Sequence, residues 1–513
     1  MNSFVARPCD QHLGCAAASR GTRVSATAAL IAAILASGMS MIDGTAVNVA
    51  LPIVQRELHA SSADIQWVVE GYALFVSALL LVGGALGDRY GRRRMFVLGT
   101  AIFAVASIAC ALAASSQMLV AARCIQGVGG ALMIPESLAL ITSAYDEKAR
   151  GRAIGTWSAA SAVTTILGPV LGGWLTQDVT WRAIFLINVP LAIAVVVIAL
   201  LYVRESHDES ETGGRPDVLG GMLATIALGA LVFGLIRYQD FGADVVALAS
   251  MLGGAILLAL FLAVERTAGN PMLRLSLFKS RTFALANLYT LVMYAALGGA
   301  LFFVPFYLIN VEHYSPTAAG AALLPMILIL ALFSRSAGAV ADRIGPRVPL
   351  IVGALIAAVG FALFGIIGTR PDYWTTVFPA ALTLGIGATI FVAPLTTSVM
   401  NSAPRSESGS AAGINNAVSR VAGMLAVAIF GIIVVSVTRS HLGDGAALPG
   451  RDALLSGIVP PGLGPVAAAA FGSAYAAGFE SAMLAGAALA VLAAASAAFL
   501  GVTAVTAGGG RQS

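Results

Sequence analysis

The sequence predicts an all-α polytopic membrane protein with fourteen transmembrane helices, arranged as two six-helix bundles plus two inserted helices. Three observations support this prediction. The 513 residues are 58% hydrophobic and only 11% charged, with a mean hydropathy of +0.89, which leaves too little polar surface for a soluble chain of this size. The apolar residues form long continuous runs, as membrane helices require, whereas a barrel would alternate over about ten residues. A charged turn also occurs twice.

The charged turn is GALGDRYGRRR at 84–94 and returns as GAVADRIGPR at 338–347. Six of the first ten residues are identical at an offset of 254 positions, which indicates a duplicated chain. The first copy is expected after the second span and the other after the tenth. Halves of six helices would separate the copies by six spans, so two extra helices are expected between the halves. The second copy has Pro346 at the position of Arg92 and is expected to be weakened.

Continuous apolar runs justify the individual helices. The predicted spans are 25–51, 66–86, 95–114, 117–141, 153–175, 183–203, 218–237, 245–264, 283–309, 316–340, 348–368, 375–399, 410–436 and 479–505. The expected domains are a cytoplasmic tail (1–24), an N-terminal six-helix bundle (25–203), a linker with two extra helices (204–282), a C-terminal six-helix bundle (283–505) and a second tail (506–513). The outer segment 438–475 is rich in Gly, Pro and Ala and is expected to be poorly ordered.

The distribution of basic residues predicts the orientation of the chain in the membrane. If the N-terminus lies inside the cell, the inner tails and loops hold 20 of the 29 Lys and Arg and the outer loops hold 6. This bias predicts a multi-pass protein of the cell (inner) membrane with both termini in the cytoplasm. It also explains the net charge of +4, so no nucleic-acid partner is expected. The four cysteines lack metal-like spacing, and neither a metal nor a cofactor is expected.

Four motifs in order resemble one family. They are DGTAVNVALP (43–52) in the first span, GALGDRYGRRR (84–94) after the second, Arg123, Gln126, Gly127, Gly129 and Gly130 in the fourth, and Gly168, Pro169, Gly172 and Gly173 in the fifth. Together they resemble the major facilitator superfamily, specifically its fourteen-span drug:proton antiporter branch. The resemblance implies two bundles that rock around a midplane site and are driven by a proton gradient.

Ionisable side chains inside a bilayer cost roughly 3 kcal/mol or more each, so they are the first functional candidates. The spans contain Asp43, Glu70, Arg123, Glu136, Arg335 and Arg420. Asp43, Glu70 and Arg123 lie at similar depth and are expected to meet in one cluster. Asp43 is the expected proton carrier, Arg123 tunes its affinity for a proton, and Glu70 is a second carrier or a contact for a cationic substrate. A purely structural buried ion pair is the alternative.

Two stretches are candidates for gating. The candidate residues of the charged turn are Gly84, Asp88, Arg89, Gly91 and Arg92. Those of the fifth span are Gly168, Pro169, Gly172 and Gly173. The turn is either a simple positive-inside anchor or, as the resemblance implies, also a latch that packs on the other half when the carrier faces outward. The fifth-span residues serve either ordinary helix packing or, as the resemblance implies, a seal and hinge between the halves.

Substrate contacts are expected from Glu136, which follows Pro135, and from the aromatic residues Trp157, Phe302 and Phe306. Glu136 lies too far inward to join the Asp43 cluster. It is either a cavity-facing carboxylate or the partner of an inner-loop arginine. The aromatic rings could equally pack in the core or face lipid.

These expectations describe a proton-coupled exporter of lipophilic, cationic or aromatic compounds that works by alternating access. Its expected partners are small lipophilic substrates, protons and the lipid bilayer, with a periplasmic adaptor left open. An ATP-driven pump is excluded because neither Lys148 nor Lys279 lies in a Gly-rich phosphate loop. An enzyme finds no support, since no histidine lies in a predicted span. A dedicated exporter of one metabolite or antibiotic and a non-transporting sensor remain as alternatives.

Overall fold

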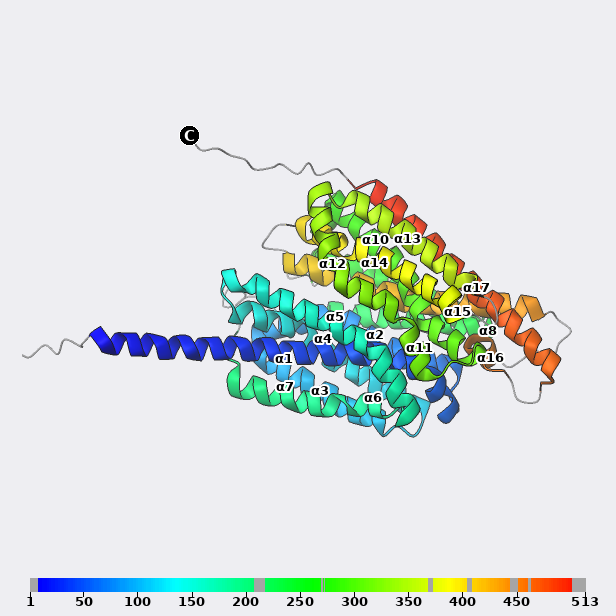
Figure 1. Ribbon diagram of the computed structural model, residues 1–513, viewed down its shortest axis with the longest axis horizontal. Helices are drawn as coiled ribbons and strands as arrows, with labels where there is room; N and C mark the ends of the chain where they lie inside the picture. The colour runs from blue at the N-terminus through cyan, green and yellow to red at the C-terminus, as the bar shows by residue number, and fades with distance from the viewer. Residues whose placement is uncertain are drawn as a thin grey trace, which may run out of the picture.

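The computed structural model describes residues 8–206, 217–268, 271, 273–367, 372–403, 408–442, 451–459 and 463–500. Within these ranges every regular element is helical (Figure 1). Thirteen of the described helices are long and apolar enough to cross a membrane. The Gly-rich helix α5 (Glu147–Asp178) occupies the remaining predicted position, so each of the fourteen predicted spans has its helix.

The first half is a bundle in which α2 and α3 pack on α4, and α1 packs on α5 and α7. Its other helices are α1 (Pro8–Glu57), α2 (Ser62–Tyr90), α3 (Arg92–Ala111), α4 (Ser116–Ala144), α6 (Ala183–Leu186) and α7 (Asn188–Tyr202). Side-chain caps set several of their starts: Ser61 and Asp64 form a capping box at α2, and Ser115 caps α4. Helix α1 begins at Pro8, inside the segment expected to be a tail.

The second half packs α13 on α14 and α17, and α10 on α15 and α17. Its elements are η2 (Leu275–Lys279), α10 (Arg281–Phe306), the π-helical turn η3 (Tyr307–Val311), α11 (Pro316–Ala322), α12 (Leu324–Ile344), α13 (Arg347–Gly365), the π-helical turn η4 (Tyr373–Val377), α14 (Phe378–Asn401), α15 (Ser408–Leu442), α16 (Arg451–Ser456) and α17 (Pro465–Ala498). Pro316, Pro325 and Pro379 stand in the first turns of α11, α12 and α14, where a missing N–H group leaves no hydrogen bond unmade.

The outer segment 438–475 corrects one expectation. It was predicted to be poorly ordered, but most of its described residues are helical, because α15 runs to Leu442, α16 lies within it and α17 begins at Pro465. Tyr475 is buried and its hydroxyl donates to the carbonyl of Leu455 at 2.9 Å. The prediction failed because an Ala- and Gly-rich composition is also typical of closely packed membrane helices. Residues 443–450 and 460–462 lie outside the described ranges.

The two inserted helices form a hairpin of α8 (Val218–Phe241) and α9 (Val245–Thr267) that touches both halves. Gln66 of α2 donates to Gln239 of α8 at 3.1 Å, and Gln239 donates to the carbonyl of Ala428 in α15 at 2.8 Å. At the hairpin turn, the Arg237 guanidinium, with the backbone N–H of the capped helix, holds the pKa of the Asp244 carboxyl below its usual value.

The two charged turns lie at one end of the molecule, which we call the Gly91 face. Gly91 and Gly345 have positive φ angles of 108° and 82° between successive helices, so the repeated turn predicted from the sequence is confirmed. We call the opposite end, which bears Trp181, the Trp181 face.

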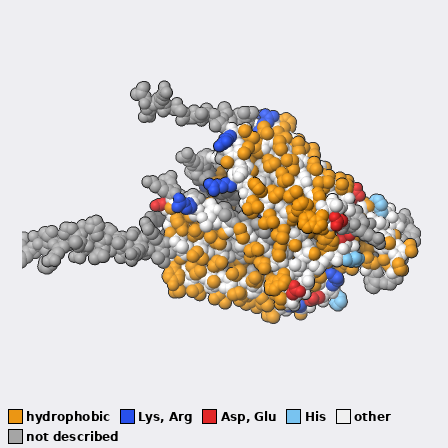
Figure 2. Space-filling view, in the orientation of Figure 1, with side chains coloured by type: hydrophobic (Ala, Val, Ile, Leu, Met, Phe, Trp, Pro, Cys, Tyr) orange, Lys and Arg blue, Asp and Glu red, His pale blue; other side chains and the backbone are white. Residues whose placement is uncertain are grey.

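The halves meet closely near the Trp181 face. There α5 packs on α11, and a Cβ atom added to Gly173 would lie 2.5 Å from the carbonyl oxygen of Pro316. Figure 2 shows a recess between the halves toward the Gly91 face, with Lys and Arg side chains at its edges. The structure is therefore closed near the Trp181 face and hollowed toward the Gly91 face.

Candidate functional site

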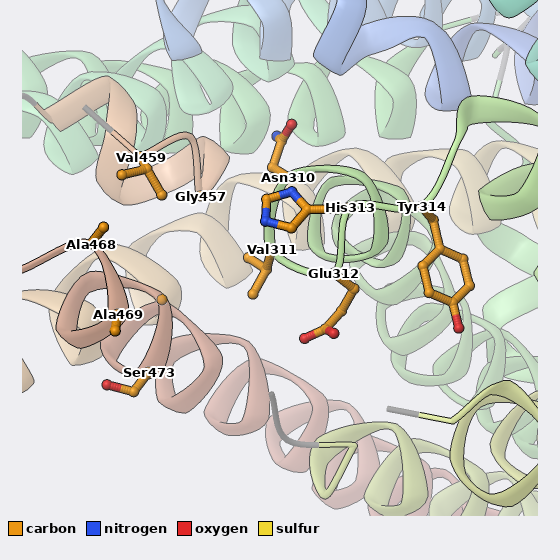
Figure 3. Close-up of a pocket in the computed structure, with 11 residues that line it drawn as sticks. Asn310, Val311, Glu312, His313, Tyr314, Gly457, Val459, Ala468, Ala469 and Ser473 are labelled. Atoms are coloured by element: carbon orange, nitrogen blue, oxygen red, sulfur yellow. The ribbon is translucent and has the colours of Figure 1, made fainter. Parts of the chain in front are cut away.

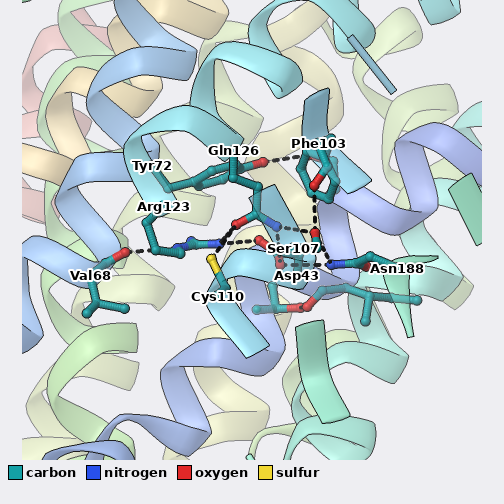
Figure 4. Close-up of polar contacts among 12 residues, drawn as sticks. Asp43, Val68, Tyr72, Phe103, Ser107, Cys110, Arg123, Gln126 and Asn188 are labelled. Carbon is teal, nitrogen blue, oxygen red and sulfur yellow. Dashed lines mark hydrogen bonds and ion pairs between the residues drawn. The ribbon is translucent and has the colours of Figure 1, made fainter. Parts of the chain in front are cut away.

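Asp43 of α1 and Arg123 of α4 form a buried ion pair inside the first half (Figure 4). Arg123 Nη1 donates to Asp43 Oδ2 at 2.5 Å, and the side chains are 0% and 1% exposed. Either charge alone would be costly there, because removing one partner of a buried pair typically destabilises a protein by about 3–5 kcal/mol. The contact predicted between these two residues is present.

Two side-chain amides complete the surroundings of the Asp43 carboxylate. Gln126 Nε2 donates to Oδ1 at 2.9 Å, and Asn188 Nδ2 donates to the same oxygen at 3.1 Å. Gln126 Oε1 in turn accepts from Arg123 Nη1 at 2.6 Å. Ser107 Oγ accepts from both amides, at 2.9 Å and 3.3 Å. Asp43 thus belongs to a network contributed by α1, α3, α4 and α7.

The Arg123 guanidinium is also held from its other side. Its Nε donates to the carbonyl of Val68 in α2 at 3.0 Å, and its centre lies 4.3 Å from the ring centroid of Tyr72. The Tyr72 hydroxyl shares a hydrogen bond of 2.8 Å with Ser40 Oγ. A cation over an aromatic face in a dry site is stabilised by about 2 kcal/mol. Arg123 is therefore fixed in position relative to both α1 and α2.

Hydrogen-bond donors surround the Asp43 carboxylate. Both carboxylate oxygens of Asp43 accept hydrogen bonds from donors that cannot accept a proton in return. Protonation would remove the charge that pairs with Arg123 and place one more hydrogen among these donors. Among the described residues of this arrangement, neither oxygen of the Asp43 carboxylate faces a group that could accept a hydrogen bond from it.

The structure does not bring Glu70 into this network. Glu70 is 1% exposed, and neither carboxylate oxygen has a hydrogen-bond partner among the described residues. Val68 and Tyr72 face Arg123, and residues two positions apart on a helix point about 200° apart. Glu70 instead falls on the stripe of α2 that contains Trp67 and Leu74, which packs on α8 and α15. Similar depth predicted the cluster, but the helix face separates Glu70 from it.

Glu136 lies apart from Asp43, as its depth predicts. It is 1% exposed, and its carboxylate occupies the place that a Cβ atom would take at Gly87 in the charged turn. Asp88, Arg92 and Glu205 are the charged groups around it. A side chain at Gly87 would therefore require the Glu136 carboxylate or α2 to move.

The charged turn is tied to its own half in this conformation. Arg92 donates to Asp88 at 2.7 Å, and the backbone N–H of Arg93 donates to Glu205 beyond α7 at 2.9 Å. A Cβ atom on Gly91 would lie 2.8 Å from the Glu205 carboxylate. The latch expected from the family resemblance belongs to the outward-facing state, and here Asp88 bonds within the first half. Arg89 is 5.4 Å from the ring of its neighbour Tyr90.

The glycines of α5 face two different partners. A Cβ atom on Gly172 would lie 2.6 Å from the carbonyl oxygen of Ala46 in α1, and Gly168 faces Thr45 of the same helix. Gly173 faces α11 of the other half, where Gly320 packs on the carbonyl of Pro169. The motif therefore serves packing within the first half and contact between halves at the same time.

The candidate aromatic residues are mostly packed. Trp157 donates from Nε1 to Ser37 Oγ at 3.0 Å between α5 and α1. Phe302 and Phe306 are each 3% exposed, and their ring centroids are 5.3 Å apart. With Gln55 and Ser62 they line a narrow crevice between the halves. In this closed arrangement these two rings belong to the contact between the halves.

A larger cavity of about 810 Å³ opens within the second half near the Trp181 face. Figure 3 shows Glu312 and His313, from the segment after η3, on one side of this cavity and Ser473 of α17 on the other. His313 has a positive φ of 57°, which is uncommon for a residue with a side chain. Asn310 anchors this segment by donating to the carbonyl of Ser456 at 2.8 Å.

Sequence reasoning did not single out Ser107, Asn188 or Tyr72, and it quoted Gln126 only as part of a motif. A signal was present for two of them. Asn188 and Ser107 are polar residues inside the apolar runs 183–203 and 95–114, where an unpaired polar group is costly. Tyr72 carried no such signal, because an aromatic residue is ordinary in a membrane helix.

Known proteins resemble the chain over most of its length. The pattern of the Major Facilitator Superfamily matches residues 33–427. The "Multidrug resistance protein Stp" of Mycobacterium tuberculosis is 34% identical over 409 residues, covering 79% of this chain and 75% of the relative. The "Tetracenomycin C resistance and export protein" of Streptomyces glaucescens is 34% identical, with 79% and 76% covered. The "Methylenomycin A resistance protein" of Bacillus subtilis is 34% identical, with 82% and 91% covered.

The fold agrees with this similarity. A crystal structure of a bacterial homologue of the human lysosomal transporter Spinster, in an inward-facing and unoccupied conformation, superposes with a TM-score of 0.65. It is 20% identical, and 93% of this chain and 97% of that chain are covered. Helix order, the repeated turn and the sequence match agree, and the chain belongs to the Major Facilitator Superfamily.

Proposed function

We propose that this protein exports lipophilic aromatic or cationic compounds across the cell membrane in exchange for protons, by alternating access. The observation that carries the proposal is the buried Asp43–Arg123 pair, whose hydrogen-bond network cannot accept a proton without rearranging. Asp43 is the proposed proton carrier. Arg123 is the proposed partner that pairs with the charged Asp43 and separates from it when Asp43 is protonated. Three relatives named for drug or antibiotic resistance support export as the direction of transport.

The proposed orientation places the Gly91 face in the cytoplasm, with both termini on that side. The support is the excess of Lys and Arg in the loops and tails of that face, 20 against 6. In this orientation the recess between the halves opens to the cytoplasm, where an exporter loads its substrate. Near the Trp181 face the contact of α5 with α11 would then be the outer gate, with Pro169 and the glycines beside it as hinge and seal.

The remaining sequence candidates take proposed roles that suit their positions. Glu136 packs against Gly87 of the charged turn and is a proposed part of the inner gate. Phe302 and Phe306 lie where the halves separate in the opposite state, so they are proposed to contact substrate on its way out. Trp157 borders α1 and is a proposed cavity contact. Glu70 remains a proposed second proton carrier on the α8 side of α2.

Everted membrane vesicles with an imposed proton gradient test the proposal. Addition of a transported compound should release protons from vesicles that contain the protein, measured with a pH-sensitive dye. Asp43→Asn should abolish this release at unchanged protein amount, whereas Asp372→Asn, an exposed carboxylate that caps η4, should leave it intact. Unchanged proton release from Asp43→Asn would contradict the proposal.

A dedicated exporter of one compound is the second candidate, favoured by a relative named for tetracenomycin C resistance and export. A panel of neutral, cationic and acidic aromatic compounds in the same vesicles separates the two. Several chemically distinct compounds releasing protons would indicate multidrug export, and a single one would indicate dedicated export. A protein that binds compounds but moves none of them would be a sensor.

A further inference from the structure

Arg420 lies in a membrane-spanning helix and has no hydrogen-bond or ion-pair partner among the described residues. It lies in α15, seven residues inside the membrane-spanning segment that begins at Gly413. It makes no hydrogen bond or ion pair with any residue that the structure describes, and its Nε is buried without a partner. An unpaired charge in such a place costs roughly 3 kcal/mol or more, so its retention calls for an explanation.

Arg420 points toward the space between the halves. Helix α15 packs on α2 of the first half. Gly413 lies two turns before Arg420 on the same face of α15, and a Cβ atom added there would lie 2.7 Å from the Leu81 side chain of α2, so this face of α15 is turned toward α2. On the same stretch of α15, Asn416 is exposed and Ser419 is partly exposed. Exposed polar side chains inside a span face water rather than lipid. This polar surface belongs to a helix that packs on α2, at the boundary between the halves.

The membrane-embedded carboxylates of the first half do not neutralise this charge. Asp43 is paired with Arg123 behind Tyr72. Glu70 and Glu136 are each 1% exposed, and Glu136 is packed against the charged turn. The sequence suggested a preference for cations because it placed carboxylates in the cavity. In the structure those carboxylates are buried between helices, and the unpaired charge on the polar surface of α15 is positive.

We propose that Arg420 binds an acidic group of the substrate, a carboxylate or a phenolate on a lipophilic aromatic compound. This inference rests on the proposed function and narrows its substrate class. A guanidinium offers a planar fork that matches a carboxylate with two parallel hydrogen bonds. A positive group at the boundary between the halves also attracts anions toward it. The acid supplies the partner that Arg420 lacks among the residues that the structure describes.

Binding to the purified full-length protein tests the inference without any need for transport. The probes are two acid–amide pairs, naphthoate with naphthamide and anthraquinone carboxylate with its amide, measured by titration calorimetry. In the wild-type protein each acid should bind more tightly than its amide. In Arg420→Gln the dissociation constant of the acids should rise about tenfold or more, as expected for losing a hydrogen-bonded charge pair, and that of the amides should not change.

Two further variants separate charge from folding. Arg420→Lys keeps the charge without the fork and should retain part of the preference for acids. Arg439→Gln removes an exposed arginine near the other end of α15 and should leave every affinity unchanged. If Arg420→Gln does not fold, the inference is still tested by the ratio of acid affinity to amide affinity, compared between the wild type and Arg420→Lys.

Equal affinities of acid and amide in the wild type, or an acid affinity that Arg420→Gln leaves unchanged, would overturn the inference. Other results would contradict the proposed function without bearing on the acidic substrate class. If tetraphenylphosphonium releases protons from everted vesicles and the acids do not bind, export stands and the acidic substrate class falls. If no compound releases protons, proton-coupled export falls, and the calorimetry still decides what Arg420 binds.

Discussion

The side chains around Asp43 are common polar residues that together form an unusual buried hydrogen-bond network. Asp43 is surrounded by one guanidinium and two amides, and each amide also donates to Ser107. Hydrogen bonds to a charged group contribute about 1.5–3 kcal/mol each, so loss of any one donor should change how readily Asp43 takes up a proton.

Asn188→Ala removes one such donor without touching the ion pair. The carboxylate loses a hydrogen bond that favours its charged form, so half-maximal transport should move to higher pH, with the protein still folded. The measurement is the pH profile of drug-driven proton release. Thr100→Ala is the matched control, because this buried hydroxyl bonds only to the carbonyl of Phe96 in its own helix. An unshifted profile in Asn188→Ala would speak against a role for the network.

Gly87→Ala tests the contact between the charged turn and Glu136. The added methyl group would overlap the Glu136 carboxylate, so either α2 or Glu136 must move. We expect a loss of stability of about 1–3 kcal/mol and a fall in transport, read by thermal unfolding and by vesicle assay. Gly338→Ala in the second copy should be tolerated, since its Cβ would meet Ala393 at an ordinary 3.5 Å. Equal behaviour of the two variants would refute the contact.

Sequence reasoning located Asp43 and Arg123 as partners but misplaced Glu70 beside them. The depth of a residue in a span can be counted along the chain, whereas its direction depends on how each helix is rotated in the bundle. Arg420 shows the same limit. Its position in the span was evident from the sequence, but its lack of a partner depends on which side chains the fold brings near it.

Among the helices, α5 packs closely on both halves. Its glycines allow α1 and α11 to approach within backbone contact distance, which joins the halves near the Trp181 face. Close approach of this kind stabilises membrane helix pairs through packing rather than through a hydrophobic effect.

Gly173→Ala should open this contact. The added Cβ would lie 2.5 Å from a backbone oxygen of α11, so the closed arrangement becomes less stable. Transport should fall about tenfold if closure is weakened by about 1.4 kcal/mol. Gly155→Ala in the same helix is the control, because nothing lies within 4 Å of its added Cβ. The measurement is initial transport rate at equal protein amount, and equal rates for both variants would contradict the assignment of α5 as a gate.

At this scale the sequence predicted the helices well and their interruptions poorly. The fourteen spans follow from continuous apolar runs, and the turns at Gly91 and Gly345 follow from the repeat. The break between α6 and α7 and the separate α11 were not predicted, although Pro190 and Pro325 mark both places. Long apolar runs conceal such breaks, because tertiary packing decides whether a proline bends a membrane helix or divides it.

The whole molecule consists of two halves joined at one end and bridged by the α8–α9 hairpin. The bridge depends on Gln239, which bonds to Gln66 of the first half and to the backbone of α15 in the second. Gln239→Leu removes both hydrogen bonds while the apolar packing of α8 on α2 and α15 remains, and it should slow the conversion between the two open states. The control is Thr225→Ala in the same helix, whose hydroxyl bonds only to Gly221. Identical transport rates would show that the hairpin is a passive insertion.

The central claim is that protons moving through Asp43 drive export. The most direct test uses purified protein in liposomes, where an imposed pH gradient is the only source of energy. Wild-type protein should accumulate a transported aromatic compound against its concentration gradient, and Asp43→Asn should only equilibrate it or not move it at all. Uphill accumulation by Asp43→Asn at the wild-type rate would contradict the account.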